Sequence, residues 1–94
     1  MGLDVGVVRL TYLERPRGAA YRFACHLAEN YWEADWEFGE GGNTLAQYDE
    51  ETLERLAAEF AESQGLSRNE RAEVMGWVAA LPYDNGVVTL HFSV

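Results

Sequence analysis

The chain of 94 residues is 48% hydrophobic and 13% aromatic. Its 16 acidic residues outnumber 7 basic ones, which gives a formal net charge of −9 at pH 7. This length fits one domain spanning 1–94, the apolar content excludes a disordered chain, and the negative charge excludes direct binding to nucleic-acid phosphates or anionic membranes.

The first third of the chain suggests two strands joined by a turn. Residues 3–13 are rich in β-branched side chains and alternate in polarity, which predicts a strand, and Pro16 and Gly18 mark a turn over 14–18. Residues 19–29 fit two patterns. A strand would group Tyr21, Phe23, Cys25 and Leu27, whereas a helix would group Ala20, Phe23, Ala24 and Leu27. We favour the strand, because a hairpin follows from a short turn.

Bulky apolar residues and carboxylates alternate over residues 31–38, which predicts a third strand. One side would carry Trp32, Ala34, Trp36 and Phe38, and the other Glu33, Asp35 and Glu37. We expect the indole side to pack on helices and the carboxylate side to face water. The glycine-rich residues 39–44 predict a flexible loop.

The period then changes to that of two helices. Asp49 is a candidate N-cap for a helix that ends near Gly65, and its predicted buried face is Leu53, Leu56, Ala57, Phe60 and Ala61. Ser67 and Glu70 match a capping box that starts a second helix, with a predicted stripe of Val74, Trp77, Val78 and Leu81. Gly76 inside that stripe suggests close packing against the first helix, and Pro82 ends the second.

The pair Asn85-Gly86 predicts a tight turn before a final strand over 87–94. The expected fold is α+β, in the order β-β-β-α-α-β, with an antiparallel sheet of about four strands and two helices packed on one face. The final strand would return to the sheet beside the first. A hairpin over 74–92 around the same turn is the rival interpretation.

Catalytic and metal-binding motifs are missing from this sequence. His26 and His91 are its two histidines, with no zinc or calcium motif, P-loop or nucleophile elbow around them. On a strand, Cys25 and His26 would point to opposite faces. We therefore expect no enzyme activity, cofactor or metal. The start of the chain, with Asp4 and no basic region before an apolar run, does not resemble a signal peptide, so we expect a cytoplasmic protein.

The negative charge is concentrated in the middle of the chain. Residues 29–62 hold eleven acids and one Arg, net −10, whereas residues 1–28 hold two acids and four Arg, net +2. An uncompensated row of carboxylates can attract a basic, Arg/Lys-rich protein surface and imitate a phosphate backbone. The expected partner-binding residues are Tyr31, Glu33, Asp35, Glu37, Glu40, Tyr48, Glu50, Glu51 and Glu54.

The expected function is therefore a non-enzymatic inhibitor that blocks a basic surface of a nucleic-acid-binding protein. Anti-CRISPR proteins, restriction inhibitors and toxin-immunity proteins share this physical type, without a motif that matches any one family. The alternative is an accessory or assembly subunit, monomeric or homodimeric, that binds through an apolar surface or a sheet edge, with the acidity serving only solubility.

Overall fold

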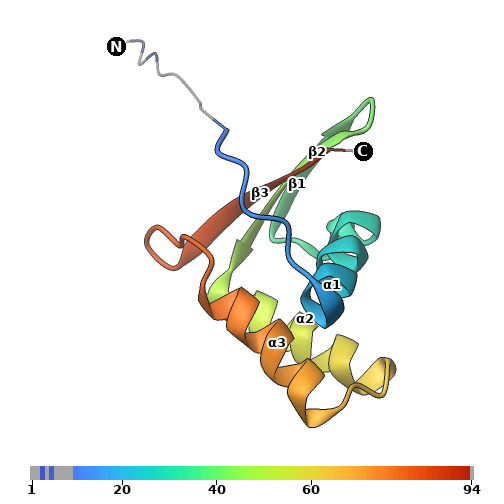
Figure 1. The fold of residues 1–94 in the computed structure, drawn as a ribbon. Helices are drawn as coiled ribbons and strands as arrows, with labels where there is room; N and C mark the ends of the chain where they lie inside the picture. The colour runs from blue at the N-terminus through green and yellow to red at the C-terminus, as the bar shows by residue number, and fades with distance from the viewer. Residues whose placement is uncertain (1–2, 4, 6–9, 94) are drawn as a thin grey trace.

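The structure, a computed structural model, describes residues 3, 5 and 10–93. Its elements follow in the order α1 (Gly18–Glu29), the 3-10 turn η1 (Tyr31–Glu33), β1 (Trp36–Glu40), β2 (Asn43–Asp49), α2 (Glu50–Ser63), α3 (Arg68–Ala79) and β3 (Val87–Ser93). The α+β class is confirmed. Instead of two helices and about four strands, the described residues form three helices and a three-stranded antiparallel sheet (Figure 1).

The N-terminal third differs from the expected hairpin. Residues 10–13 form no strand, and of the remainder of the expected strand only residues 3 and 5 lie within the described residues. Residues 18–29 form a helix, so the strand interpretation of 19–29 was wrong. Ala19, Phe23 and Leu27 are buried at helical spacing, which explains why the helix wins.

The N-terminus of α1 is held by a distant residue. Arg17, at the N-cap, makes no capping bond with its side chain, but the backbone N–H of Ala19 donates to Glu73 Oε2 at 3.2 Å. Gly18 has φ +59°, and a Cβ there would lie 2.9 Å from the same oxygen. The Arg22 guanidinium also donates to Glu70 at 2.6 Å, which ties α1 to the first turn of α3.

The sheet contains a strand, β2, that the sequence pattern did not indicate. Gly41 and Gly42, with φ of 57° and 82°, form a two-residue turn between β1 and β2, where we had expected a flexible loop over 39–44. β3 pairs with β2, so the strand order of the described residues is β1-β2-β3, and the expected place of the last strand beside residues 3–13 lies mostly outside the described residues.

The two faces of the sheet have different environments, as Figure 1 shows, because the helices gather on one side. Toward the helices point Ala46, Tyr48, Val88 and Leu90, all of them buried. Cross-strand partners share a face, so the register places Trp36, Phe38, Leu45 and His91 together on the other side. We call this side the open face of the sheet.

Helices α2 and α3 agree with the sequence prediction. The predicted face of α2 is buried throughout, and the Asp49 side chain accepts from Thr52 N–H at 2.7 Å. Ser67 and Glu70 form the predicted capping box, and Val74, Val78 and Leu81 are buried. Helix α3 packs against both other helices, and it excludes the rival hairpin over 74–92. The Asn85-Gly86 turn is confirmed as well, with φ of 55° and 78°.

The expected close packing at Gly76 is absent, since a Cβ there would meet no described heavy atom within 4 Å. We therefore expect Gly76→Ala to raise the free energy of unfolding by about 1 kcal/mol, because alanine loses less backbone entropy in a helix. Urea unfolding followed by circular dichroism measures the change. Gly65→Ala is the matched control: at φ +60° the added Cβ strains the backbone, so that variant should be less stable. A loss of stability in Gly76→Ala would contradict the open environment.

Candidate functional site

The open face of the sheet carries a cluster of exposed apolar side chains. Trp36 and Phe38 on β1 remain 50% and 55% exposed, and Leu45 on β2 lies directly between Phe38 and His91 in the register. We call Trp36, Phe38, Leu45 and His91 the aromatic patch. Because a regular sheet holds these side chains, their positions are fixed before any partner arrives.

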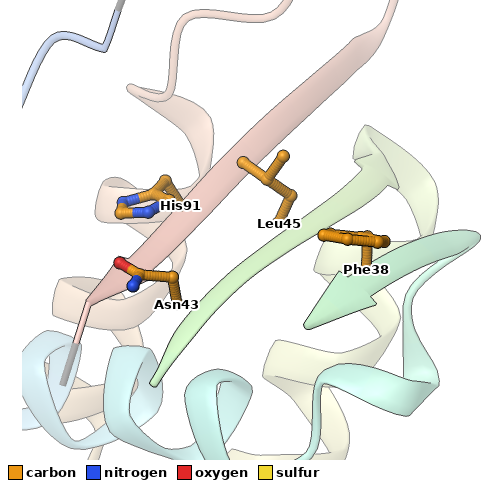
Figure 2. A pocket seen from close by; sticks show the side chains of 4 residues that line it. All are labelled: Phe38, Asn43, Leu45 and His91. Atoms are coloured by element: carbon orange, nitrogen blue, oxygen red, sulfur yellow. The ribbon is translucent and has the colours of Figure 1, made fainter. Parts of the chain in front are cut away.

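The patch is hollowed rather than flat. Phe38, Asn43, Leu45 and His91 surround a hollow of about 260 Å³, and Figure 2 shows their side chains standing on the three strands. Asn43 supplies an amide and His91 an imidazole at the rim, whereas Phe38 and Leu45 are apolar. Such a surface suits a partner that inserts an apolar side chain and forms a hydrogen bond at the edge.

The indole side of the third strand was expected in the core, and this expectation was wrong. Alternation correctly separated Trp36 and Phe38 from Glu37. The residue facing the helical layer, however, is Glu37, which is paired with buried Ala46. On the sheet, the core beneath the helices is completed by Ala46 and Tyr48 of β2 and by Val88 and Leu90 of β3, so the bulky side of the edge strand β1 is left outside.

The three acidic residues of this segment do not form a row along one strand. Glu33 belongs to η1, Asp35 precedes β1, and only Glu37 lies within a strand. All three side chains are exposed. The regular spacing on which the imitation of a phosphate backbone depends is therefore absent.

Asp35 has a structural role in place of a free carboxylate. Its Oδ2 accepts from the backbone N–H of Asp49 at 2.8 Å, and its Oδ1 lies 3.4 Å from Thr52 Oγ1. Two carboxylates, Asp35 and Asp49, thus satisfy backbone and side-chain donors where α2 begins, and negative charge is favourable at that end of a helix. The hydrogen bonds from Thr52 hold the pKa of Asp49 below its usual range.

The two expected tyrosine anchors are also used inside the protein. Tyr31 is half-buried against the core and meets Trp32 edge-to-face, with ring centroids 5.8 Å apart. Tyr48 is completely buried and cannot touch a partner. Its hydroxyl has no hydrogen-bond partner among the described residues, and burial, followed by the charges of Glu33 and Asp35, raises its pKa to about 12.

The remaining expected residues are distributed over α2 and the hairpin. Glu51 and Glu54 are exposed, and Glu50 is partly covered. Burial raises the pKa of Tyr83 to about 12, and the nearby negative charges of Glu50 and Glu54 add to this shift. Glu40 ends β1, and its side chain lies outside the described part of the structure. The acidic residues are therefore spread over several elements and do not form one cluster.

We expect Tyr48→Phe to leave the free energy of unfolding unchanged or to raise it by about 1 kcal/mol, because it removes a buried hydroxyl without a partner. The control is Tyr83→Phe, which should lose about 1 kcal/mol since the Tyr83 hydroxyl donates to the Val78 carbonyl at 2.7 Å. Chemical unfolding of the two variants at neutral pH gives the comparison. A clear loss in Tyr48→Phe would mean that its hydroxyl does have a partner.

Buried Tyr48 and partly buried Tyr83 also predict an alkaline limit to stability. Both have folded-state pKa values of about 12, above the ordinary 10.0, so folding favours their neutral form. That contribution is complete below pH 10 and is lost as the pH rises from 10 to about 12. Unfolding transitions measured across this window should show falling stability, with a smaller fall in a Tyr48→Phe/Tyr83→Phe double variant. An equal fall in both proteins would contradict this assignment.

The groups with catalytic chemistry are separated. His26 is on α1 and His91 on β3. Because residues 18–29 are helical, Cys25 and His26 line one shallow groove, rather than opposite faces as expected for a strand. No hydrogen bond joins them among the described residues, and His26 Nδ1 instead lies 3.3 Å from Asn30 Nδ2. No three metal-ligating side chains converge in the part of the chain that the structure describes.

Comparison of the chain with protein-family models, with curated proteins and with solved structures gave no match. The site must therefore be interpreted from its own geometry. None of the helices formed by the described residues is long and apolar enough to cross a membrane. Sequence reasoning missed the aromatic patch because it placed Trp36 and Phe38 in the core and treated His91 as an ordinary strand residue.

Proposed function

We propose that the protein is a non-enzymatic accessory or assembly subunit that binds a partner protein through the aromatic patch. One observation carries this proposal: Trp36 and Phe38 stand half-exposed on a rigid sheet face that the helices leave uncovered. Tryptophan and other aromatic side chains dominate the binding energy of many protein interfaces. Exposed apolar surface that is clustered and hollowed marks an interaction site more often than scattered residues do.

The chemistry expected of the partner follows from the patch. Phe38 and Leu45 call for an apolar side chain, and Asn43 and His91 call for a polar group at the rim. The acids of residues 29–62 favour a partner with basic residues around this contact, since unlike charges speed association. The charge then steers the encounter, and the apolar contact supplies most of the affinity.

A second candidate is the acidic inhibitor of a basic, nucleic-acid-binding surface. It is favoured by the lack of charge compensation: Arg55–Glu59, at 3.1 Å, is the one ion pair among the described residues that uses an acid from 29–62. In this candidate the exposed acids of α2, such as Glu51 and Glu54, would make the contact. The aromatic patch would then be incidental.

Site-specific photo-crosslinking in a lysate of the native host distinguishes the two candidates. A benzoylphenylalanine at position 38 reports on the patch. The same group at Ala58 reports on the acidic side of α2, because Ala58 is exposed and lies one turn from Glu54 and Glu62. We expect a discrete protein adduct from position 38 and none from position 58. The reverse pattern would contradict the patch and support the acidic inhibitor.

A further inference from the structure

The free edge of β3 is a second surface that the core does not use. Among the described residues, β3 pairs with β2 on one side only, and β1 forms the opposite edge of the sheet. Its sequence, VVTLHFS, contains no acid, Lys or Arg. The edge formed by β1 differs, because Glu37 places a negative charge on it. Charged side chains discourage strand addition, so β1 is protected and β3 is open to it.

The orientation of the backbone identifies the available groups. Val87 and Asp84 exchange hydrogen bonds of 3.1 and 2.8 Å, so Val87 directs its N–H and C=O away from β2. These directions alternate along an antiparallel strand, so Thr89, His91 and Ser93 also point their backbone groups outward. No described residue outside β3 supplies backbone partners to these three positions. They form a five-residue template, 89–93, for another strand.

The contact between the N-terminal segment and His91, near this edge, leaves a polar atom unpaired. Residues 10–14 of the N-terminal segment, together with Pro82, Thr89 and His91, line a groove of about 280 Å³. The Tyr12 ring meets His91 edge-to-face at 6.2 Å, but Tyr12 remains 71% exposed. His91 Nδ1 is buried there without a hydrogen-bond partner among the described residues. A buried, unpaired nitrogen is costly, so a rearrangement at this edge that gives His91 Nδ1 a partner is favoured.

The N-terminal segment itself has the composition of a strand. Residues 3–13 are rich in β-branched side chains and alternate in polarity. Their described apolar side chains nevertheless face solvent, with Leu3 at 87%, Val5 at 83% and Leu10 at 53% exposure. Residues 1–28 carry a net charge of +2, whereas residues 29–62 carry −10. The +2 comes from residues 14–28, because residues 3–13 hold only Asp4 and Arg9 and are neutral, so no net negative charge opposes their approach to the acidic part of another copy.

We propose that the edge of β3 accepts residues 3–13 of a second copy of this chain as an added strand, in a reciprocal exchange that makes a dimer. Backbone hydrogen bonds to Thr89, His91 and Ser93 would hold the strand, and its alternate side chains would extend the two faces of the sheet. This inference concerns the backbone edge of β3, which shares only His91 with the aromatic patch, and it does not depend on the proposed function.

Sedimentation velocity of the full chain over an about hundredfold range of concentration tests the proposal. We expect a monomer–dimer equilibrium. Thr89→Pro removes an outward N–H without touching the ladder to β2. A triple variant, Leu3→Asn/Val5→Asn/Leu10→Asn, weakens the donated segment at exposed positions. Each should raise the dissociation constant of the dimer about tenfold or more, with an unchanged circular dichroism spectrum.

Mixing the two variants gives the sharpest outcome. The triple variant retains an intact β3 edge, and the Thr89→Pro variant retains an intact N-terminal segment. The mixture should therefore form a mixed dimer in which the segment of the second variant pairs with the edge of the first. A wild-type chain that stays monomeric would overturn the proposal. Dimers that Thr89→Pro disrupts but the triple variant does not would also overturn it, because they would indicate pairing between two β3 edges. If Thr89→Pro changes the circular dichroism spectrum, the triple variant alone decides.

Discussion

The double variant Trp36→Ser/Phe38→Ser should bind the partner captured by crosslinking at least about a hundredfold more weakly than the wild-type protein. Central aromatic side chains contribute about 2 kcal/mol or more each when truncated, and about 2.7 kcal/mol corresponds to a hundredfold change in affinity. Both side chains are already half-exposed, so the fold should survive their loss. Titration calorimetry with the purified partner measures the effect.

The matched control is Tyr21→Ser/Met75→Ser. These residues are 44% and 39% exposed, but they lie on α1 and α3, in the helical layer on the other side of the sheet. We expect their loss to leave affinity within about twofold of wild type, because residues outside the contact contribute little. Equal weakening by both double variants would show that general surface hydrophobicity, and not the aromatic patch, determines binding.

Phe23→Ala should lower the free energy of unfolding by about 3–5 kcal/mol, the usual cost of removing a large buried aromatic side chain. Phe23 is completely buried, and its ring centroid lies 5.4 Å from that of Phe60 and 6.1 Å from that of Trp77. It therefore joins α1 to both other helices. Chemical unfolding curves give the loss directly.

Tyr21→Ala is the control for this variant, and it also tests the secondary structure. In the helix, Tyr21 is 44% exposed and faces away from Phe23, so its loss should cost well under 1 kcal/mol. In a strand over 19–29, Tyr21 and Phe23 would share one face and both losses would be large. Comparable destabilisation by the two variants would therefore contradict helix α1.

Helices α2 and α3 could be predicted because their signals are local. Asp49 caps α2, Ser67 and Glu70 cap α3, and the buried residues recur at helical spacing between these ends. Helix α1 lacks such a signal. Its N-terminus is bound by Glu73, 54 residues away, and no neighbouring residue in the sequence indicates that contact. Short apolar alternation with small residues then fits a strand as well as a helix.

The second strand, β2, was hidden by its composition. Asn43, Ala46 and Gln47 have low strand propensity, and their place in the sheet depends on pairing with β1 and β3. The Gly41-Gly42 pair was the available signal, since two adjacent residues with positive φ join hairpin strands. Missing this turn removed the central strand from the expected fold.

The candidate site shows what the alternation of residues can predict and what it cannot. Alternation over residues 31–38 correctly grouped Trp36 with Phe38, but alternation cannot determine which group faces the core. That choice is made by β2, whose Ala46 and Tyr48 are buried beneath the helices and so fix the orientation of Glu37. Asp35 and Tyr48, both expected at a partner surface, are instead held by the N-terminus of α2 and by the core.

The most direct test of the aromatic patch is the affinity for the captured partner measured at about 0.1 M and about 1 M NaCl, since salt screens exposed charges over about 10 Å and 3 Å respectively. Binding through Trp36, Phe38 and Leu45 predicts a slower association rate in high salt and a dissociation constant that changes by less than about tenfold. Loss of binding in high salt, with affinity retained in Trp36→Ser/Phe38→Ser, would contradict the patch and assign the contact to the acidic residues.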